Sequence, residues 1–81
     1  MIDWKNHIGT DRDVLAGKPI IKGTRLSVEF VLERLASGWS ENEVLANYPR
    51  LTSEDIKAIH AFTYECMRDG LLLAMPNVKR A

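Results

Sequence analysis

The sequence has a single cysteine, Cys66, no long apolar run and no excess of charge of either sign. One cysteine cannot form a disulfide within the chain or a multi-cysteine zinc site, and it is typical of a reducing compartment. The longest apolar run, residues 71–75, is far shorter than the roughly 20 residues that a helix needs to cross a bilayer. The N-terminal residues show no basic segment followed by an apolar one, so no secretion signal is predicted. We therefore expect a cytoplasmic protein without membrane contact.

Eleven basic residues balance eleven acidic residues, which gives the 81-residue chain a formal net charge of zero. A protein that binds nucleic acid by itself is usually basic, so such a role here needs a local basic patch or a dimer. A chain of this length forms one domain, residues 1–81, and buries only about 60% of the surface that its unfolded form exposes. Because the core of such a domain is marginal, we expect a homodimer.

The pattern of the sequence changes near Ser27. Before it, short apolar pieces alternate with glycine and proline, which predicts a hairpin or small β-ribbon within residues 1–26. Two apolar pieces flank the turn at residues 16–18, namely Val14-Leu15 and Pro19-Ile20-Ile21. Gly17 and Gly23 suit turn positions with positive φ, and Pro19 suits the start or the edge of a strand.

Residues 27–70 repeat apolar side chains with the period of a helix, which predicts a bundle of three helices joined by short turns. Glu43 completes a capping box three residues after Ser40, and Asp55 stands at the same spacing after Thr52. The residues that mark the helix starts are Ser27, Ser40 and Thr52, and those that mark the ends are Gly38, Pro49 and Gly70. On the inner face of the third helix we expect Ile56, Ile59, Thr63, Cys66 and Met67. The predicted fold class is α+β, mainly α, with a C-terminal tail at residues 71–81.

No arrangement of residues typical of catalysis is visible. His7 and His60 lie in different segments, and neither has a metal ligand at a suitable spacing beside it. Glu54 and Asp55 are adjacent, so they diverge around a helix and favour its N-terminus rather than one metal ion. Cys66 falls on the predicted apolar face, as a small core residue does. We therefore expect no enzymatic activity, no metal and no cofactor.

Four residues of the third helix recur at a spacing that forms one outward stripe: Lys57, Ala61, Tyr64 and Arg68. A helix that follows a short turn and another helix can enter the major groove of DNA, where a small Ala61 permits close approach and the cations meet phosphates. Glu54 and Glu65 border the stripe, so a solvated face of mixed charge is the alternative. Arg50 and Lys18 are further candidates for contact with the DNA backbone.

A second set of residues suggests an interface. Phe30 and Trp39 are large aromatic residues outside the predicted inner face of the first helix, and they either stand in a dimer interface or pack within the chain. The tail adds Leu71, Leu72, Leu73 and Met75 as apolar candidates for dimer or partner contact. Such a tail can fold back, pair between subunits or become ordered on a partner.

Residues 17–28, GKPIIKGTRLSV, resemble the G-K-P-x-I-x-G-T-R signature of the domain-of-unknown-function family 433, and residues 48–56, YPRLTSEDI, resemble its second motif. The resemblance extends from about residue 8 to about residue 65. It implies a homeodomain-like fold with a helix-turn-helix and no known catalytic residues. In these motifs we expect structural roles for Gly17, Pro19, Gly23, Thr24, Arg25, Tyr48 and Pro49. The guanidinium of Arg25 is expected to pin the ribbon to the bundle through a carboxylate or carbonyl groups.

Members of this family are often described as predicted antitoxins of the VapB type, which are paired with PIN-like ribonuclease toxins. The resemblance therefore implies an antitoxin of a type II toxin–antitoxin module, which neutralises its toxin and, as a dimer, binds operator DNA. The alternative is a dimeric protein-interaction module that does not bind DNA, which the zero net charge favours.

Overall fold

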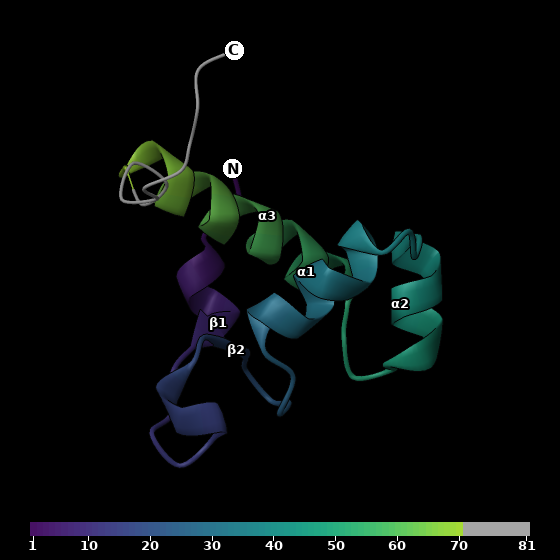
Figure 1. Ribbon diagram of the computed structural model, residues 1–81, viewed down its shortest axis with the longest axis horizontal. Helices are drawn as coiled ribbons and strands as arrows, with labels where there is room; N and C mark the ends of the chain where they lie inside the picture. The colour runs from purple at the N-terminus through teal and green to yellow at the C-terminus, as the bar shows by residue number, and fades with distance from the viewer. Residues whose placement is uncertain (71–81) are drawn as a thin grey trace.

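A computed structural model describes residues 1–70 of the chain, and Figure 1 shows their arrangement. Two short strands, β1 (Ile8–Gly9) and β2 (Ile20–Ile21), form an antiparallel pair near the N-terminus. Three helices follow in the order α1 (Val28–Ala36), α2 (Glu41–Asn47) and α3 (Ser53–Arg68). Single 3-10 turns precede each strand, η1 (Trp4–Asn6) and η2 (Leu15–Gly17). The predicted fold class, α+β and mainly helical, is confirmed.

The pairing of the ribbon differs from the predicted hairpin. The partner of β2 is β1, with Ile8 opposite Ile21, whereas Val14 forms only an isolated bridge to Asp11. Leu15 lies in η2 with a positive φ of 52°, a conformation that interrupts a strand. The observed pairing buries Ile8 and Ile21 in the core, while Leu15 stays about half exposed at 48%. Burial of apolar surface therefore favours the pairing of β2 with β1, which lies farther away along the chain than Val14 and Leu15 do.

The helix starts lie where they were predicted. The hydroxyl of Ser27 accepts a hydrogen bond from the backbone N–H of Phe30 at 2.9 Å. Complete capping boxes open the other two helices, with Ser40 and Glu43 at α2 and Thr52 and Asp55 at α3. Side chains and backbone thus satisfy N–H groups that have no partner within the helix. The expected ends are also confirmed, since Gly38 and Gly70 follow α1 and α3 with positive φ and α2 stops before Pro49.

The core joins the ribbon to all three helices. Its largest fully buried side chains are Ile21, Val31, Val44, Ile56 and Ile59. The predicted inner face of α3 is wrong at its C-terminal end, where Met67 is 54% exposed and Cys66 is only half-buried. Ala58 and Ala61 are buried instead. The cause is the N-terminal segment, which packs along α3 and turns the buried face of this helix toward itself.

Candidate functional site

The N-terminal segment, residues 1–7, covers one side of α3. The rings of Trp4 and Phe62 meet edge to face, with 4.8 Å between their centroids and 77° between their planes. The indole Nε1 of Trp4 donates a hydrogen bond to Oε2 of Glu65 at 2.9 Å. One side chain thus combines an apolar contact with a polar one, and the segment is held to the middle of α3. This contact was not predicted, because Trp4 and Glu65 lie 61 residues apart.

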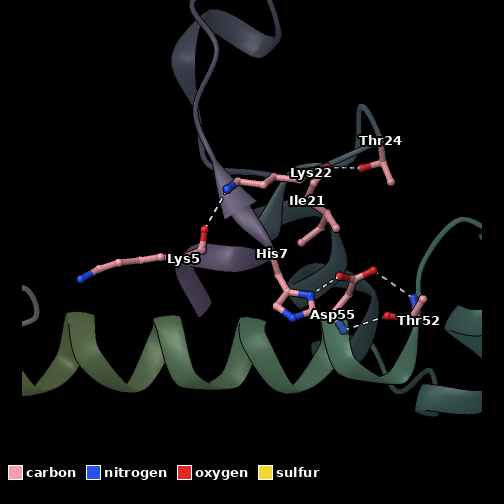
Figure 2. A network of polar contacts seen from close by, with 7 residues as sticks. All are labelled: Lys5, His7, Ile21, Lys22, Thr24, Thr52 and Asp55. Atoms are coloured by element: carbon pink, nitrogen blue, oxygen red, sulfur yellow. Dashed lines mark hydrogen bonds and ion pairs between the residues drawn. The ribbon is translucent and has the colours of Figure 1, made fainter. Parts of the chain in front are cut away.

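The carboxylate of Asp55 joins this segment to the start of α3 (Figure 2). Oδ1 of Asp55 lies 2.8 Å from Nδ1 of His7, and Oδ2 accepts a hydrogen bond from the backbone N–H of Thr52 at 3.0 Å. An ionised carboxylate only accepts, so Nδ1 of His7 is the donor. Asp55 is 9% exposed. One of its carboxylate oxygens completes the capping box of α3, and the other contacts His7. Its capping role was predicted from spacing, whereas the contact with His7 was not.

A second pair of contacts in Figure 2 fixes the ribbon. Nζ of Lys22 donates to the backbone oxygen of Lys5 at 2.8 Å, and the hydroxyl of Thr24 donates to the backbone oxygen of Ile21 at 2.8 Å. The same hydroxyl accepts from the backbone N–H of Leu26 at 3.0 Å. Thr24, a residue of the first motif, therefore closes the turn after β2 through its hydroxyl.

The outer face of α3 is formed by its exposed residues Lys57, His60, Tyr64, Met67 and Arg68. Three members of the predicted DNA-binding stripe belong to it, but Ala61 does not. Ala61 is only 4% exposed, because it faces the N-terminal segment, and the expected exposed stripe is wrong at this position. An open hollow of about 440 Å³ remains between Met1, Ile2 and this part of α3. Tyr64 forms one wall of the hollow and is 51% exposed.

The charges on and around this outer face are mixed. Nζ of Lys57 lies 3.4 Å from a carboxylate oxygen of Glu54, and Nε of Arg68 lies 3.3 Å from one of Asp69. Residues 53–69 contain two cationic side chains and four carboxylates. Such exposed pairs contribute little to stability and can be exchanged for other partners. The helix as a whole is nevertheless acidic, which opposes its entry into a DNA groove.

The candidate interface residues Phe30 and Trp39 are half-buried and pack within the chain. Phe30 meets Tyr48 of the α2 end edge to face with 5.5 Å between ring centroids, and Trp39 stacks on Tyr48 at 6.3 Å. The guanidinium of Arg34 lies over both rings, 4.5 Å from the centre of Phe30 and 5.4 Å from that of Trp39. These contacts favour packing within the chain, rather than a place in a dimer interface, for both aromatic residues. The other interface candidates, Leu71, Leu72, Leu73 and Met75, lie outside the described residues.

The two sequence motifs meet at one place on the surface. Nη1 of Arg50 donates a hydrogen bond to the backbone oxygen of Gly23 at 3.1 Å and so joins the ribbon loop to the turn between α2 and α3. The expected pinning of the ribbon is thus made by Arg50, whereas Arg25 is exposed. A hollow of about 320 Å³ opens here, and we call it the motif hollow. It is lined by Thr24, Arg25, Leu26, Asn47, Tyr48, Pro49 and Arg50.

The remaining residues of the first motif shape the turns of the ribbon and link it to α1. Gly17 and Gly23 both adopt a φ of 81°, which glycine reaches at little cost. The backbone oxygen of Pro19 accepts a hydrogen bond from the N–H of Val28 at 3.0 Å and so ties the ribbon to α1. Nζ of Lys18 lies 2.9 Å from Oε1 of Glu29 in an exposed ion pair. The predicted DNA-binding residues are therefore divided between the outer face of α3 and the region around the ribbon.

The described residues form neither a metal cluster nor a membrane-spanning helix. Within residues 1–70, no three His, Cys, Asp or Glu side chains gather so that they could hold a metal ion. In the same part of the chain, no helix is both long and apolar enough to cross a membrane.

These features define a small α+β domain in which a two-stranded ribbon is packed against three helices. The chain belongs to the DUF433 family, described as "Protein of unknown function", whose model matches residues 8–63. It is similar to the crystal structure of a DUF433 member protein from Anabaena variabilis ATCC 29413, with 31% sequence identity and a TM-score of 0.73. The similarity covers 80% of this chain and 64% of that one, so this chain matches less than two thirds of the solved protein. Among curated proteins there is no match.

Proposed function

We propose that this protein is an antitoxin-like binding module that neutralises a PIN-like ribonuclease through the outer face of α3. The observation that carries this proposal is the exposed apolar surface there. Tyr64 and Met67 on α3 are 51% and 54% exposed, and Met1, which lines the open hollow together with Tyr64, is 92% exposed. Exposed large apolar side chains beside an open hollow are typical of a surface that binds another protein.

The charges around this surface support a ribonuclease as the partner. A ribonuclease has to attract the phosphates of RNA, so its substrate groove carries positive charge. Glu54, Glu65 and Asp69 flank the apolar residues of α3 and offer the complementary charge. Charge complementarity of this kind speeds association and selects the partner.

The binding of operator DNA stays a prediction. Lys57, Tyr64 and Arg68 are exposed on α3, which favours it, but the burial of Ala61 and the acidic character of the helix oppose contact through this face. These two observations favour the alternative in which α3 binds protein and not DNA.

Inhibition of a nuclease by purified protein tests the proposal. The proposal expects a PIN-like nuclease to be encoded beside this gene; that nuclease is the probe, and its cleavage of RNA is measured with increasing amounts of this protein. Wild type is expected to stop cleavage at an equimolar ratio. Tyr64→Asp is expected to weaken inhibition about thirtyfold, because loss of a buried interface tyrosine costs about 2 kcal/mol.

Leu15→Asp is the matched control, because Leu15 is a similarly exposed apolar residue in the turn η2, away from the outer face of α3. It is expected to inhibit as wild type does. Equal inhibition by Tyr64→Asp and wild type would contradict the proposed face, and absence of inhibition by wild type would contradict the proposed function.

A homodimer is the expected state of the protein in solution. The physical reason is the marginal core of a chain of this size together with the exposed apolar groups near α3. Light scattering at micromolar concentration measures the mass directly, and twice the mass of one chain is expected. The mass of a single chain would contradict this prediction.

A further inference from the structure

The motif hollow differs from the outer face of α3 in its charge. Arg25 and Arg50 line it, and none of the described residues that line it is acidic. Arg50 is joined to the ribbon loop by its hydrogen bond to Gly23. A chain with zero net charge thus places two cations together at this hollow. Such a concentration raises the local density of anions and favours a polyanionic partner.

The two guanidinium groups at the hollow are available to a ligand. Arg25 is exposed, and Arg50 is also exposed while a single nitrogen, Nη1, is used for Gly23. Each guanidinium has five N–H donors in a planar fork, which suits the oxygens of a phosphate. The hydrogen bond to Gly23 also holds Arg50 in place, so less conformational entropy is lost when it binds.

The lining of the hollow also includes apolar residues. Leu26, Tyr48 and Pro49 line it together with the two arginines. The ring of Tyr48 is itself held by Phe30 and Trp39 on the side of α1 and α2. Surfaces that combine fixed aromatic or apolar groups with cations are typical of sites that bind a nucleic-acid strand, where the sugar or base rests on the apolar part.

We propose that the motif hollow binds the phosphate backbone of a nucleic acid, with Arg25 and Arg50 on phosphate oxygens and a sugar or base against Tyr48 and Pro49. This assigns nucleic-acid contact to the ribbon side of the molecule, which lies below α3 in the view of Figure 1. It deepens the operator-binding prediction and is independent of the inhibition of a nuclease through α3.

Fluorescence anisotropy of labelled nucleic acid tests this assignment. The probes are a duplex from the region upstream of this gene and a single strand of the same sequence, titrated with the full chain at several salt concentrations. Wild type is expected to bind one or both at low salt. Arg25→Ala with Arg50→Ala is expected to weaken binding by on the order of tenfold and to lower the log–log salt slope by about two.

Lys57→Ala with Arg68→Ala is the control pair for the location of the site. It also removes two positive charges, but from the outer face of α3, the other surface that carries predicted DNA-binding residues. It is expected to change affinity less than twofold. Arg25→Ala alone, at an exposed position without a structural hydrogen bond among residues 1–70, is expected to weaken binding without changing the thermal unfolding curve. That single variant separates loss of a contact from loss of the loop conformation that Arg50 holds.

Three results would overturn the proposal. No binding by wild type at low salt would refute it, and so would a loss in the control pair that equals or exceeds the loss in the arginine pair. Tighter binding of a labelled poly-glutamate peptide than of either nucleic acid, with the same dependence on Arg25 and Arg50, would identify an acidic protein as the partner instead. The variant with Arg25→Ala and Arg50→Ala is expected to inhibit the nuclease as strongly as wild type, because the proposed nuclease-binding face lies on α3. This result distinguishes failure of one proposal from failure of the other.

Discussion

Replacing Asp55 with alanine is expected to lower the free energy of unfolding by about 3 kcal/mol. The substitution removes one half of the capping box of α3, the hydrogen bond from the backbone N–H of Thr52 to Oδ2 of Asp55, which is worth about 1 kcal/mol. It also leaves the imidazole of His7 without its acceptor in a partly buried place, at a further cost of about 1–3 kcal/mol. Urea unfolding followed by circular dichroism measures the change.

Glu54→Ala is the control for this prediction, because Glu54 is exposed on the same turn and, among residues 1–70, is paired only with Lys57, at 3.4 Å. Its effect is expected to stay within about 0.5 kcal/mol. A double-mutant cycle with His7→Ala sharpens the test, since His7→Ala is expected to cost little once Asp55 is absent. Additive effects of the two substitutions would show that the contact between the side chains contributes nothing.

Ile21→Ala is expected to lower the free energy of unfolding by about 3–4 kcal/mol, because it leaves a cavity where the side chain is fully buried. A domain of this size is stable by only about 4–12 kcal/mol, so much of the stability is lost. Leu15→Ala is the control, at a position 48% exposed in the turn before β2, and is expected to have a small effect.

The shape of the transition is a second measurement on the Ile21 variant. Ile21 lies in the ribbon but belongs to the same core as the helices, so ribbon and bundle are expected to unfold together. Coincident curves from circular dichroism, which follows the helices, and from Trp4 fluorescence in a Trp39→Phe background, which follows the N-terminal segment, are the expected result. Fluorescence that changes well before the helices melt would show that residues 1–26 unfold on their own.

The helices were predictable because their signals are local. The caps at Ser27, Ser40 and Thr52 act within three residues of chain, and a turn glycine or proline acts on its immediate neighbours. The pairing of β1 with β2 was missed, because it depends on which isoleucines reach the core rather than on the turn between nearby apolar pieces. Register in a sheet follows the buried face, and a single sequence does not show which strand will offer it.

The candidate surfaces were also predictable only where local spacing determines them. Helical spacing correctly placed Lys57, Tyr64 and Arg68 on the outside of α3. It failed at Ala61, because the side that looked open is covered by a segment from the other end of the chain. It also could not show that Arg50 joins Gly23, a contact across 27 residues that brings the two motifs to one hollow. Contacts of this length become visible only when the chain is folded.

The two tryptophans stand in separate surroundings, and this gives the protein two built-in optical reporters. Trp4 lies against Phe62 and Glu65, where it senses the attachment of the N-terminal segment to α3. Trp39 lies beside Arg34 and Tyr48, where it senses the packing of α1 against the end of α2, next to the motif hollow. Trp4→Phe and Trp39→Phe each leave one emitter. Spectra of the two variants can therefore follow a partner on the α3 side and one on the ribbon side without any attached dye.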